Sequence, residues 1–356
     1  MKIRLELISL LAAGIVGFSA CEPDAPRGEK ATAKPVKSTI VQSTTPSATK
    51  ENTTTLAKPT PNELTFNETT YNYDVVTGAT RTTFGSNPKP LYPYEEKLGK
   101  MFWSNQPPLG LLMGNYFTNE GTFDVGNKGI VEVVTDSQGK ILSVEFQEYG
   151  APDYYESKYA GANKRLSDYA FFQAKSPRTD ETLVTVVNGI TFVEEQMRKE
   201  NRLAGNFKTV KGSSTTARQG LMAIASELAP VIRQPSPIQY LGYAEDFGNG
   251  LIGRIQLTTE NGKILTARYD EYFADQPENI QEPQLKPYYR QSKYYSLTYN
   301  EATNHQFKKF SDQLTKTIVD TQSLTITDPE LLKNTNFANY QRLFEKLPVD
   351  QAANGN

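Results

Sequence analysis

The sequence is poor in the two residues that most metal and thiol chemistry requires, with one Cys and one His among 356 residues. One Cys excludes an intrachain disulfide, and one Cys with one His cannot make a Cys/His zinc site, a CxxCH haem attachment or a cysteine-ligated iron–sulfur cluster. Motifs of the HExxH, P-loop and Ser/His/Asp types are also missing. Redox chemistry would therefore depend on an organic cofactor, and a hydrolase has no support.

A strong charge of one sign is lacking as well. The chain has 38 Lys and Arg against 40 Asp and Glu, which gives a formal net charge of -2. Nucleic-acid-binding domains usually carry a clear excess of basic residues. We therefore expect no nucleic-acid partner.

The N-terminal apolar run, from Leu7 to Ala20, is too short for a membrane-spanning helix, which needs about 20 residues. Lys2 and Arg4 precede the run, and this order is typical of an export signal. Residues 1–20 are therefore predicted to be a signal peptide.

The only Cys follows this signal directly. The stretch Phe18-Ser19-Ala20-Cys21 resembles a bacterial lipoprotein box, in which the Cys receives lipid and becomes the mature N-terminus. The resemblance implies a lipid anchor at Cys21. Two acyl chains hold a protein on a membrane stably, whereas one chain is marginal. A secreted protein with an unmodified Cys is the alternative.

Residues 21–65 are rich in Thr, Ser, Pro, Ala and Lys and have almost no aliphatic side chains. This composition cannot build an apolar core, so we predict a disordered tether. A flexible coil of about 45 residues reaches about 35 to 40 Å, which would let the rest of the chain sample a shell above the membrane. Residues 346–356 are predicted to be a disordered tail.

Two later segments of the chain resemble each other. Residues 139–149 (GKILSVEFQEY) match residues 262–272 (GKILTARYDEY), and each segment follows a strand-like stretch and a turn. The pattern predicts two β-hairpins, with turns at Asp136 to Gly139 and at Glu260 to Gly262. Helical periodicity appears at residues 190–203, 216–232 and 304–319.

Further matches follow the hairpins in the same order in both halves, which indicates a duplication. We therefore predict an α+β fold with two tandem repeats, residues 96–234 and 235–345. Each repeat would have an antiparallel sheet with packed helices, because strands precede helices without regular βαβ alternation. Residues 66–95 form a separate segment before the first repeat.

That segment holds the sharpest local motif, DVVTGATRT at residues 74–82. It resembles the flavinylation motif of FMN-binding domains, in which an Asp precedes a Ser/Thr-Gly-Ala-Thr core and a further hydroxyl residue. The resemblance implies that Thr80 accepts FMN through a phosphoester, and that the other motif residues are Asp74, Thr77, Gly78, Ala79 and Thr82. A small Gly-Ala corner would leave the hydroxyl open to a modifying enzyme. A Thr/Gly turn at the end of a polar linker is the alternative.

Residues 209–217 (TVKGSSTTA) resemble a degraded copy of this motif. Ser214 stands where the acceptor Thr would be, and is a further candidate for flavin attachment, although Lys208 and Ser213 depart from the pattern. A fainter trace is present at residues 320–325 (DTQSLT).

Together these features resemble the flavinylated, lipid-anchored extracellular proteins of Gram-positive bacteria that carry two FMN-binding domains and serve extracellular electron transfer. Some of those proteins also release a pheromone peptide from their signal sequence. The resemblance implies a repeat of FMN-binding-like domains, covalent FMN, a flavin transferase as partner, and an electron donor in a membrane quinone or NADH dehydrogenase system. It places the chain on the extracellular face of the cytoplasmic membrane, as an electron carrier more than an enzyme with its own substrate.

One departure from that family is that the intact motif precedes the first repeat instead of closing it. The alternative function is a cell-surface binding lipoprotein whose repeats have lost flavin.

Lys164 and Arg165 are candidates for contact with an FMN phosphate; the alternative is that they form a solvated basic pair. Tyr-rich stretches such as Tyr154 to Tyr159 and Tyr288 to Tyr295 would stack a flavin ring or pack half-buried on a sheet, and Trp103 is expected in the core.

Overall fold

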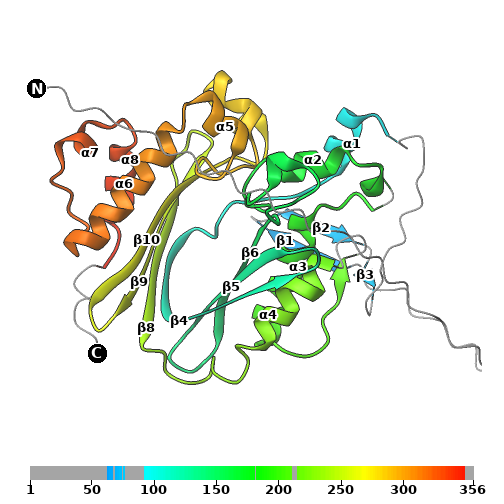
Figure 1. Ribbon diagram of the computed structural model, residues 1–356, viewed down its shortest axis with the longest axis horizontal. Helices are drawn as coiled ribbons and strands as arrows, with labels where there is room; N and C mark the ends of the chain where they lie inside the picture. Colours follow the sequence, from blue (N-terminus) through cyan, green and yellow to red (C-terminus); the bar gives the residue numbers. More distant parts are fainter. Residues whose placement is uncertain are drawn as a thin grey trace, which may run out of the picture. The chain divides into compact units, whose positions relative to one another are not determined.

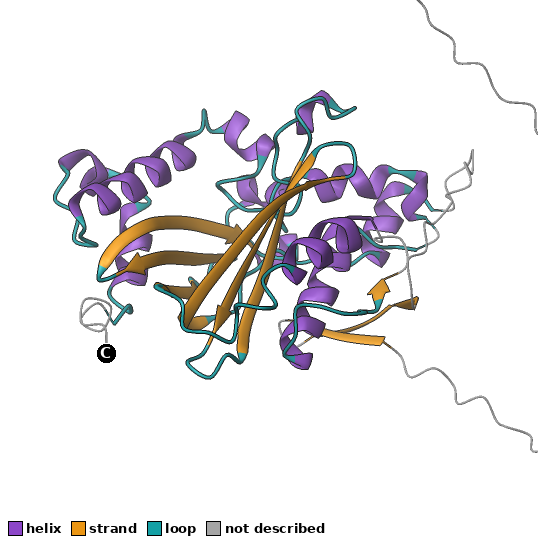
Figure 2. Ribbon diagram, turned by 60° about the horizontal axis from the view of Figure 1, so that its bottom comes forward, coloured by secondary structure: helices purple, strands orange, loops and turns teal. Residues whose placement is uncertain are grey.

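The main sheet of the protein has six antiparallel strands in the order β10-β9-β8-β4-β5-β6 (Figures 1 and 2). The computed structural model describes residues 62–66, 69–73, 75–76, 92–180, 182–210 and 215–348. The chain divides into two units, Met1–Leu56 and Ala57–Asn356, and all described residues belong to the second. Several helices pack on the sheet, so the predicted α+β class with an antiparallel sheet is confirmed.

Each half of the chain contributes three consecutive strands to this sheet. The first half supplies β4 (Gly110–Phe123), β5 (Asn127–Thr135) and β6 (Ile141–Tyr149). The second half supplies β8 (Ile238–Asp246), β9 (Leu251–Glu260) and β10 (Lys263–Phe273). Both hairpins predicted from the sequence, β5 with β6 and β9 with β10, are present.

The turns of these hairpins follow from their residues. In the second hairpin Asn261 and Gly262 both have positive φ, 50° and 78°, which is the twist that a two-residue hairpin loop needs. In the first hairpin the Asp136 side chain accepts hydrogen bonds from the backbone N–H groups of Gln138 and Lys140. The backbone N–H of Gly139 donates to the carbonyl of Asp136 and closes the turn.

The two halves join through β4. Its residues Gly110 to Asn115 pair with β8, and its residues Asn115 to Phe123 pair with β5. β8 and β5 therefore pair with different stretches of β4, and the two hairpins leave this strand at different points along its length.

The helices follow the strands within each half. In and before the first half these are α1 (Tyr94–Lys100), α2 (Tyr169–Lys175), α3 (Val186–Glu200), the π-helical stretch η3 (Thr216–Met222) and α4 (Ala223–Ser226). In the second half they are α5 (Leu297–Ala302), α6 (Gln306–Thr321), α7 (Pro329–Lys333) and α8 (Phe337–Phe344). Short 3-10 turns connect them at Ser157–Tyr159, Pro177–Thr179, Pro277–Asn279 and Pro283–Tyr288.

Helix α3 begins earlier than its apolar periodicity predicted. A reciprocal capping box between Thr185 and Asn188 starts the helix at Val186. The helix ends where Asn201 adopts a left-handed conformation with φ of 51°. The Oδ1 atom of Asn201 then accepts a hydrogen bond from the backbone N–H of Ile141, which joins the helix end to β6.

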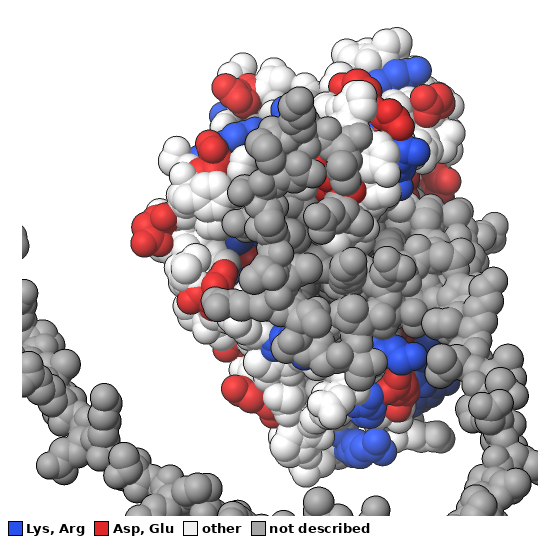
Figure 3. All heavy atoms as spheres, turned by 90° about the vertical axis from the view of Figure 1, so that its right-hand side faces the viewer, with Lys and Arg blue, Asp and Glu red and all other residues white. Residues whose placement is uncertain are grey.

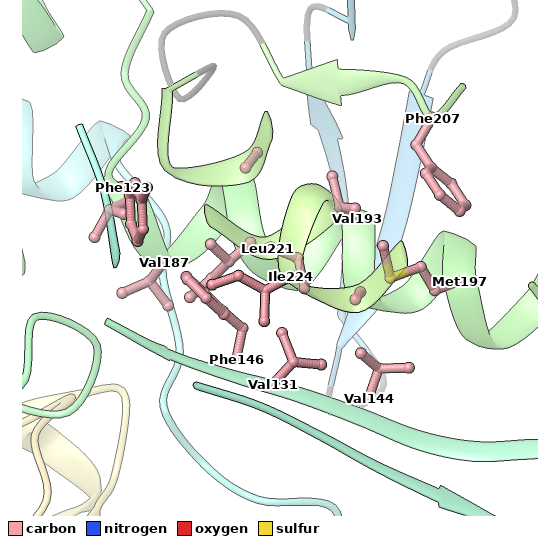
Figure 4. Packing of buried hydrophobic residues seen from close by; sticks show 14 of the residues in the cluster. Phe123, Val131, Val144, Phe146, Val187, Val193, Met197, Phe207, Leu221 and Ile224 are labelled. Carbon is pink, nitrogen blue, oxygen red and sulfur yellow. The ribbon is translucent and has the colours of Figure 1, made fainter. Parts of the chain in front are cut away.

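One apolar core lies under the helices of each half. In the first half, side chains of α3 and η3 such as Val193 and Leu221 face Val131 and Phe146 of the sheet (Figure 4). In the second half, α6 and α8 cover β9 and β10, and Leu314 and Tyr340 are fully buried. Trp103 is 1% exposed, as expected for a core residue.

Four short strands lie outside the main sheet. β1 (Asn62–Phe66) pairs with β2 (Thr69–Tyr73), and β3 (Val75–Val76) pairs with β7 (Thr209–Val210), both antiparallel. β1 thus begins within residues 21–65, which were predicted to be a disordered tether, whereas β2 and β3 lie in the segment that carries the motif.

Candidate functional site

The segment that leads into the flavinylation-like motif pairs with the first half of the chain. Val75 of β3 is opposite Val210 of β7, and Val76 is opposite Thr209. The Val210 side chain is fully buried against Val184 and against Phe192 of α3. The start of the motif is therefore held next to α3, and β7 is also the start of residues 209–217, the stretch that resembles a degraded motif.

The residues predicted to carry FMN lie outside the described residues. They are Asp74, Thr77, Gly78, Ala79, Thr80 and Thr82, and the same holds for Ser214 and for the lipid-attachment residue Cys21.

Two ion pairs connect strands that lie far apart in the main sheet. Glu132 of β5 meets Arg268 of β10 at 2.6 Å, and Glu145 of β6 meets Arg254 of β9 at 2.9 Å. Three strands separate the partners in each pair. In a flat sheet such strands would be about 19 Å apart, because neighbouring strands are spaced about 4.8 Å. The sheet therefore curls until the inner faces of its two hairpins meet.

Both pairs are hydrogen-bonded through two guanidinium nitrogens. Burial alone would raise the pKa of Glu145, but the charges of Arg254 and Arg165 lower this pKa to about 2. The Tyr116 hydroxyl donates a hydrogen bond to the Glu132 carboxylate. The inner face of the sheet is thus a polar interior, and in these two pairs the acids come from the first half and the guanidinium groups from the second.

A cavity of about 430 Å³ opens beside β6, and we call it the β6 cavity. Its apolar rim is the stretch from Pro107 to Leu112, where Leu109 and Leu111 are 58% and 50% exposed. Its polar wall includes Arg165, which donates to both carboxylate oxygens of Glu194 on α3, at 2.6 and 3.2 Å. The buried Oδ1 atom of Asn105, a lining residue, accepts no hydrogen bond from the described residues.

A second cavity, of about 190 Å³, lies beside β10, and we call it the β10 cavity. Asp270 of β10 lines it and is 7% exposed. Burial raises the pKa of Asp270 to about 7, although hydrogen bonds from the Ser292 hydroxyl and from the backbone N–H groups of Tyr294 and Glu271 act in the opposite direction. Such a shift in a cavity wall is typical of functional sites.

Each half also contains one buried Lys–Glu pair in a matching position. Lys164 contacts Glu148 at 2.8 Å, and Lys293 contacts Glu271 at 2.5 Å. In both, the Lys backbone N–H donates to the carbonyl of the same Glu. Lys164 is 3% exposed and Arg165 is paired with Glu194, so the alternative expectation of a solvated basic pair is wrong.

The tyrosines proposed as a flavin stack mostly pack on other aromatic rings. Tyr154 lies 4.7 Å from Tyr155 between ring centres, and Tyr159 lies 5.1 Å from Tyr169. Tyr155 is 78% exposed. Half-buried packing therefore describes most of them, as the alternative interpretation expected.

Acidic and basic side chains are interspersed on the described part of the face shown in Figure 3. Among the described residues, no helix combines the length and apolarity needed to cross a bilayer. The same residues contain no group of three or more His, Cys, Asp or Glu side chains arranged to hold a metal ion.

Comparison with known proteins finds no matching family model, no matching curated protein and no matching solved structure.

Sequence reasoning missed the polar interior and the β10 cavity. One signal was present, because the matched hairpins align Glu145 with Arg268 and so reverse a charge at equivalent positions. A reversed charge on strands that both face inward indicates complementary surfaces. Nothing comparable marked Asp270, whose surroundings come from residues of a distant loop.

Proposed function

We propose that the chain is a lipid-anchored extracellular flavoprotein, with FMN on Thr80, that passes electrons from a membrane quinone or NADH dehydrogenase system to extracellular acceptors. The observation that carries this proposal is the complete motif at residues 74–82, which includes the two residues of β3. Pairing of β3 with β7 supports it, because the motif then begins at a fixed place on the first half.

We also infer that the two halves arose by duplication of an FMN-binding-like domain. The supporting observations are three consecutive antiparallel strands in each half and the matching pairs Glu148–Lys164 and Glu271–Lys293. An isolated β-bridge follows in each half, from Tyr149 to Asn163 and from Tyr272 to Ser292.

The described residues offer a fit for a flavin ring in the β6 cavity. Pockets for ligands of this size are about 300 to 1,000 Å³, and the cavity of about 430 Å³ falls in that range. The Pro107 to Leu112 rim would cover an apolar ring edge. Helix α3 contributes both to this cavity, through Thr191, and to the support of β7, through Phe192.

FMN supplies one- or two-electron transfer when bound. The chain would hold the cofactor by a covalent bond, because an exported protein cannot regain a flavin that dissociates into the surroundings. The tether would keep the carrier close to its membrane donor, which raises the effective concentration of the two.

The test is the intact mass of the chain exported from cells that also express a flavin transferase. We expect one added FMN unit in the native protein and none in Thr80→Ala. Thr70→Ala, in β2, is the matched control and should keep the added mass. Ser214→Ala distinguishes a second acceptor, because only a second FMN would disappear. An unmodified mass in the native protein, while other flavinylated proteins of the same cells are loaded, would remove this proposal.

The alternative function is a cell-surface binding lipoprotein without a redox role, and the two cavities favour it as the second candidate. The colour of the purified protein distinguishes the two proposed functions. A yellow protein whose fluorescence remains on the band after denaturing electrophoresis excludes the binding function as the sole one.

A further inference from the structure

The β10 cavity differs from the β6 cavity in the charges that its wall leaves uncompensated. Its wall contains four charged residues, namely Glu145, Arg268, Asp270 and Asp312. Glu145 and Arg268 are neutralised by their ion pairs across the sheet. Asp270 and Asp312 have no Lys or Arg at ion-pair distance among the described residues.

The hydrogen bonds of these two acids come from neutral groups only. Asp270 accepts from the Ser292 hydroxyl at 2.5 Å and from two backbone N–H groups, at 2.8 and 3.0 Å. Asp312 accepts from the Tyr294 hydroxyl at 2.6 Å. A carboxylate has about four acceptor sites, so Asp270 keeps one free. The wall therefore has an excess of negative charge and an open acceptor.

Aromatic rings form much of the rest of the wall. The lining residues include Tyr272, Tyr294 and Tyr295, whereas the ring of the fourth lining tyrosine, Tyr269, packs on Phe307, Phe310 and Tyr340 in the apolar core. The rings of Tyr294 and Tyr295 are 4.8 Å apart between centres and meet edge to face. The faces of such rings attract cations, by about 0.5 to 2 kcal/mol per contact. Lys308, which does not line the cavity, already places its Nζ atom 5.0 Å from the centre of the Tyr294 ring.

We propose that the β10 cavity binds a small organic cation, an alkylammonium or quaternary ammonium group, between the tyrosine rings and the Asp270 carboxylate. The volume of about 190 Å³ corresponds to about six water molecules, which suits a ligand of choline size. This site is separate from the proposed flavin and does not depend on it.

The titration of Asp270 supports this proposal. Its raised pKa, about 7, means that an uncompensated charge is unfavourable there, and a bound cation would replace the proton. The charged and titratable groups around it are Arg268, Glu271 and Tyr272 on β10, Arg254 opposite on β9, Glu145 on β6, Tyr294 and Tyr295 on the loop before α5, and Asp312 on α6. Arg254 and Arg268 are paired with Glu145 and Glu132, so among the described residues no Lys or Arg forms an ion pair with Asp270.

The experiment is titration calorimetry at pH 8 with the full chain in nonionic detergent and choline chloride as the probe. We expect saturable binding that weakens at least tenfold in Asp270→Asn and is unchanged in Asp320→Asn, an exposed acid on α6. The neutral carbon isostere 3,3-dimethyl-1-butanol should not bind. Tyr294→Leu, which leaves the carboxylate in place, should also weaken choline binding, and this variant covers the case in which Asp270→Asn fails to fold.

Three results would overturn the proposal. They are the absence of saturable choline binding, equal affinity for choline and its neutral isostere, and unchanged choline affinity in both Asp270→Asn and Tyr294→Leu. None of these results depends on whether Thr80 carries FMN.

Discussion

The Glu145 carboxylate on β6 and the Arg254 guanidinium on β9 meet at 2.9 Å across the interior of the curled sheet. The second such pair, Glu132 with Arg268, runs between the other two strands of the hairpins. Every acid in these pairs belongs to the first half and every Arg to the second. Two copies of one half would bring like charges together, so the charges favour the pairing of unlike halves.

Arg254→Met should destabilise the protein by about 3 kcal/mol, because Glu145 would remain in a polar interior without its cation. Replacing both residues with Met should recover most of the loss, since the ionic pair is then replaced by apolar side chains of similar length. Urea denaturation of the two single variants and the double variant measures this coupling.

A matched surface pair is the control for this cycle. Lys316 and Asp320 pair on α6 with side chains 74% and 57% exposed. Exposed ion pairs contribute little, so Lys316→Met should leave the urea midpoint unchanged. Equal losses in Arg254→Met and Lys316→Met would contradict the role of the interior pair.

The buried lysines should respond alike in the two halves. Lys164→Met and Lys293→Met each leave a buried Glu without its ammonium partner, and each should cost about 3 to 5 kcal/mol. Lys333→Met, whose Lys is 74% exposed, should have no measurable effect on the same denaturation curve. A neutral result at one of the two buried lysines would argue against equivalent roles for the matching pairs.

Local features of the fold could be predicted from the sequence because they depend on residues close together in the chain. The Asn261-Gly262 turn and the alternating strands beside it are one example. The helix that became α6 is another, since its apolar spacing places Phe307, Phe310 and Leu314 on one buried face. The start of α3 was misjudged because a polar cap at Thr185, not an apolar residue, defines it.

The candidate sites were harder to predict because they are made by contacts between distant residues. The curl of the sheet brings Glu132 to Arg268, which are 136 residues apart in the chain. The surroundings of Asp270 include Ser292, on a loop 22 residues later. No periodicity or turn signal reports such contacts, whereas the motif around Thr80 is contiguous and can be read directly.

Gly114 provides a test of how β4 passes from one half to the other. A Cβ atom at this position would lie 2.1 Å from the carbonyl oxygen of Thr135, so the backbone of β4 or β5 would have to move. Gly114→Ala should therefore destabilise the protein by at least about 2 kcal/mol. Gly99→Ala makes the same change in α1 with no atom within 4 Å of the new Cβ, and should be neutral or stabilising. Thermal unfolding followed by circular dichroism compares the two, and equal effects would refute the close approach at Gly114.

Asp270 should give the protein a distinctive pH dependence. Its pKa is about 7 in the folded chain against 3.8 as the ordinary value, so between these values the folded state binds a proton that the unfolded state releases. The contribution of Asp270 to the free energy of unfolding therefore falls as pH rises from about 4 to 7, by about 1.4 kcal/mol per pH unit at most. Asp270→Asn cannot ionise, so its stability relative to the native protein should increase over that range.

Glu145 acts at lower pH and in the opposite direction. With its folded pKa at about 2, below the ordinary 4.5, it stabilises the protein above pH 4.5 and loses that contribution as pH falls toward 2. Burial also raises the pKa of Asp275, to about 6, but Asp275 is present in both proteins. The difference between Asp270→Asn and the native protein in urea denaturation at pH 4.5, 5.5, 6.5 and 7.5 therefore isolates Asp270, with Asp320→Asn as the exposed control. If the stability difference between Asp270→Asn and the native protein stays constant across this series, the carboxyl of Asp270 titrates normally and the β10 cavity does not raise its pKa.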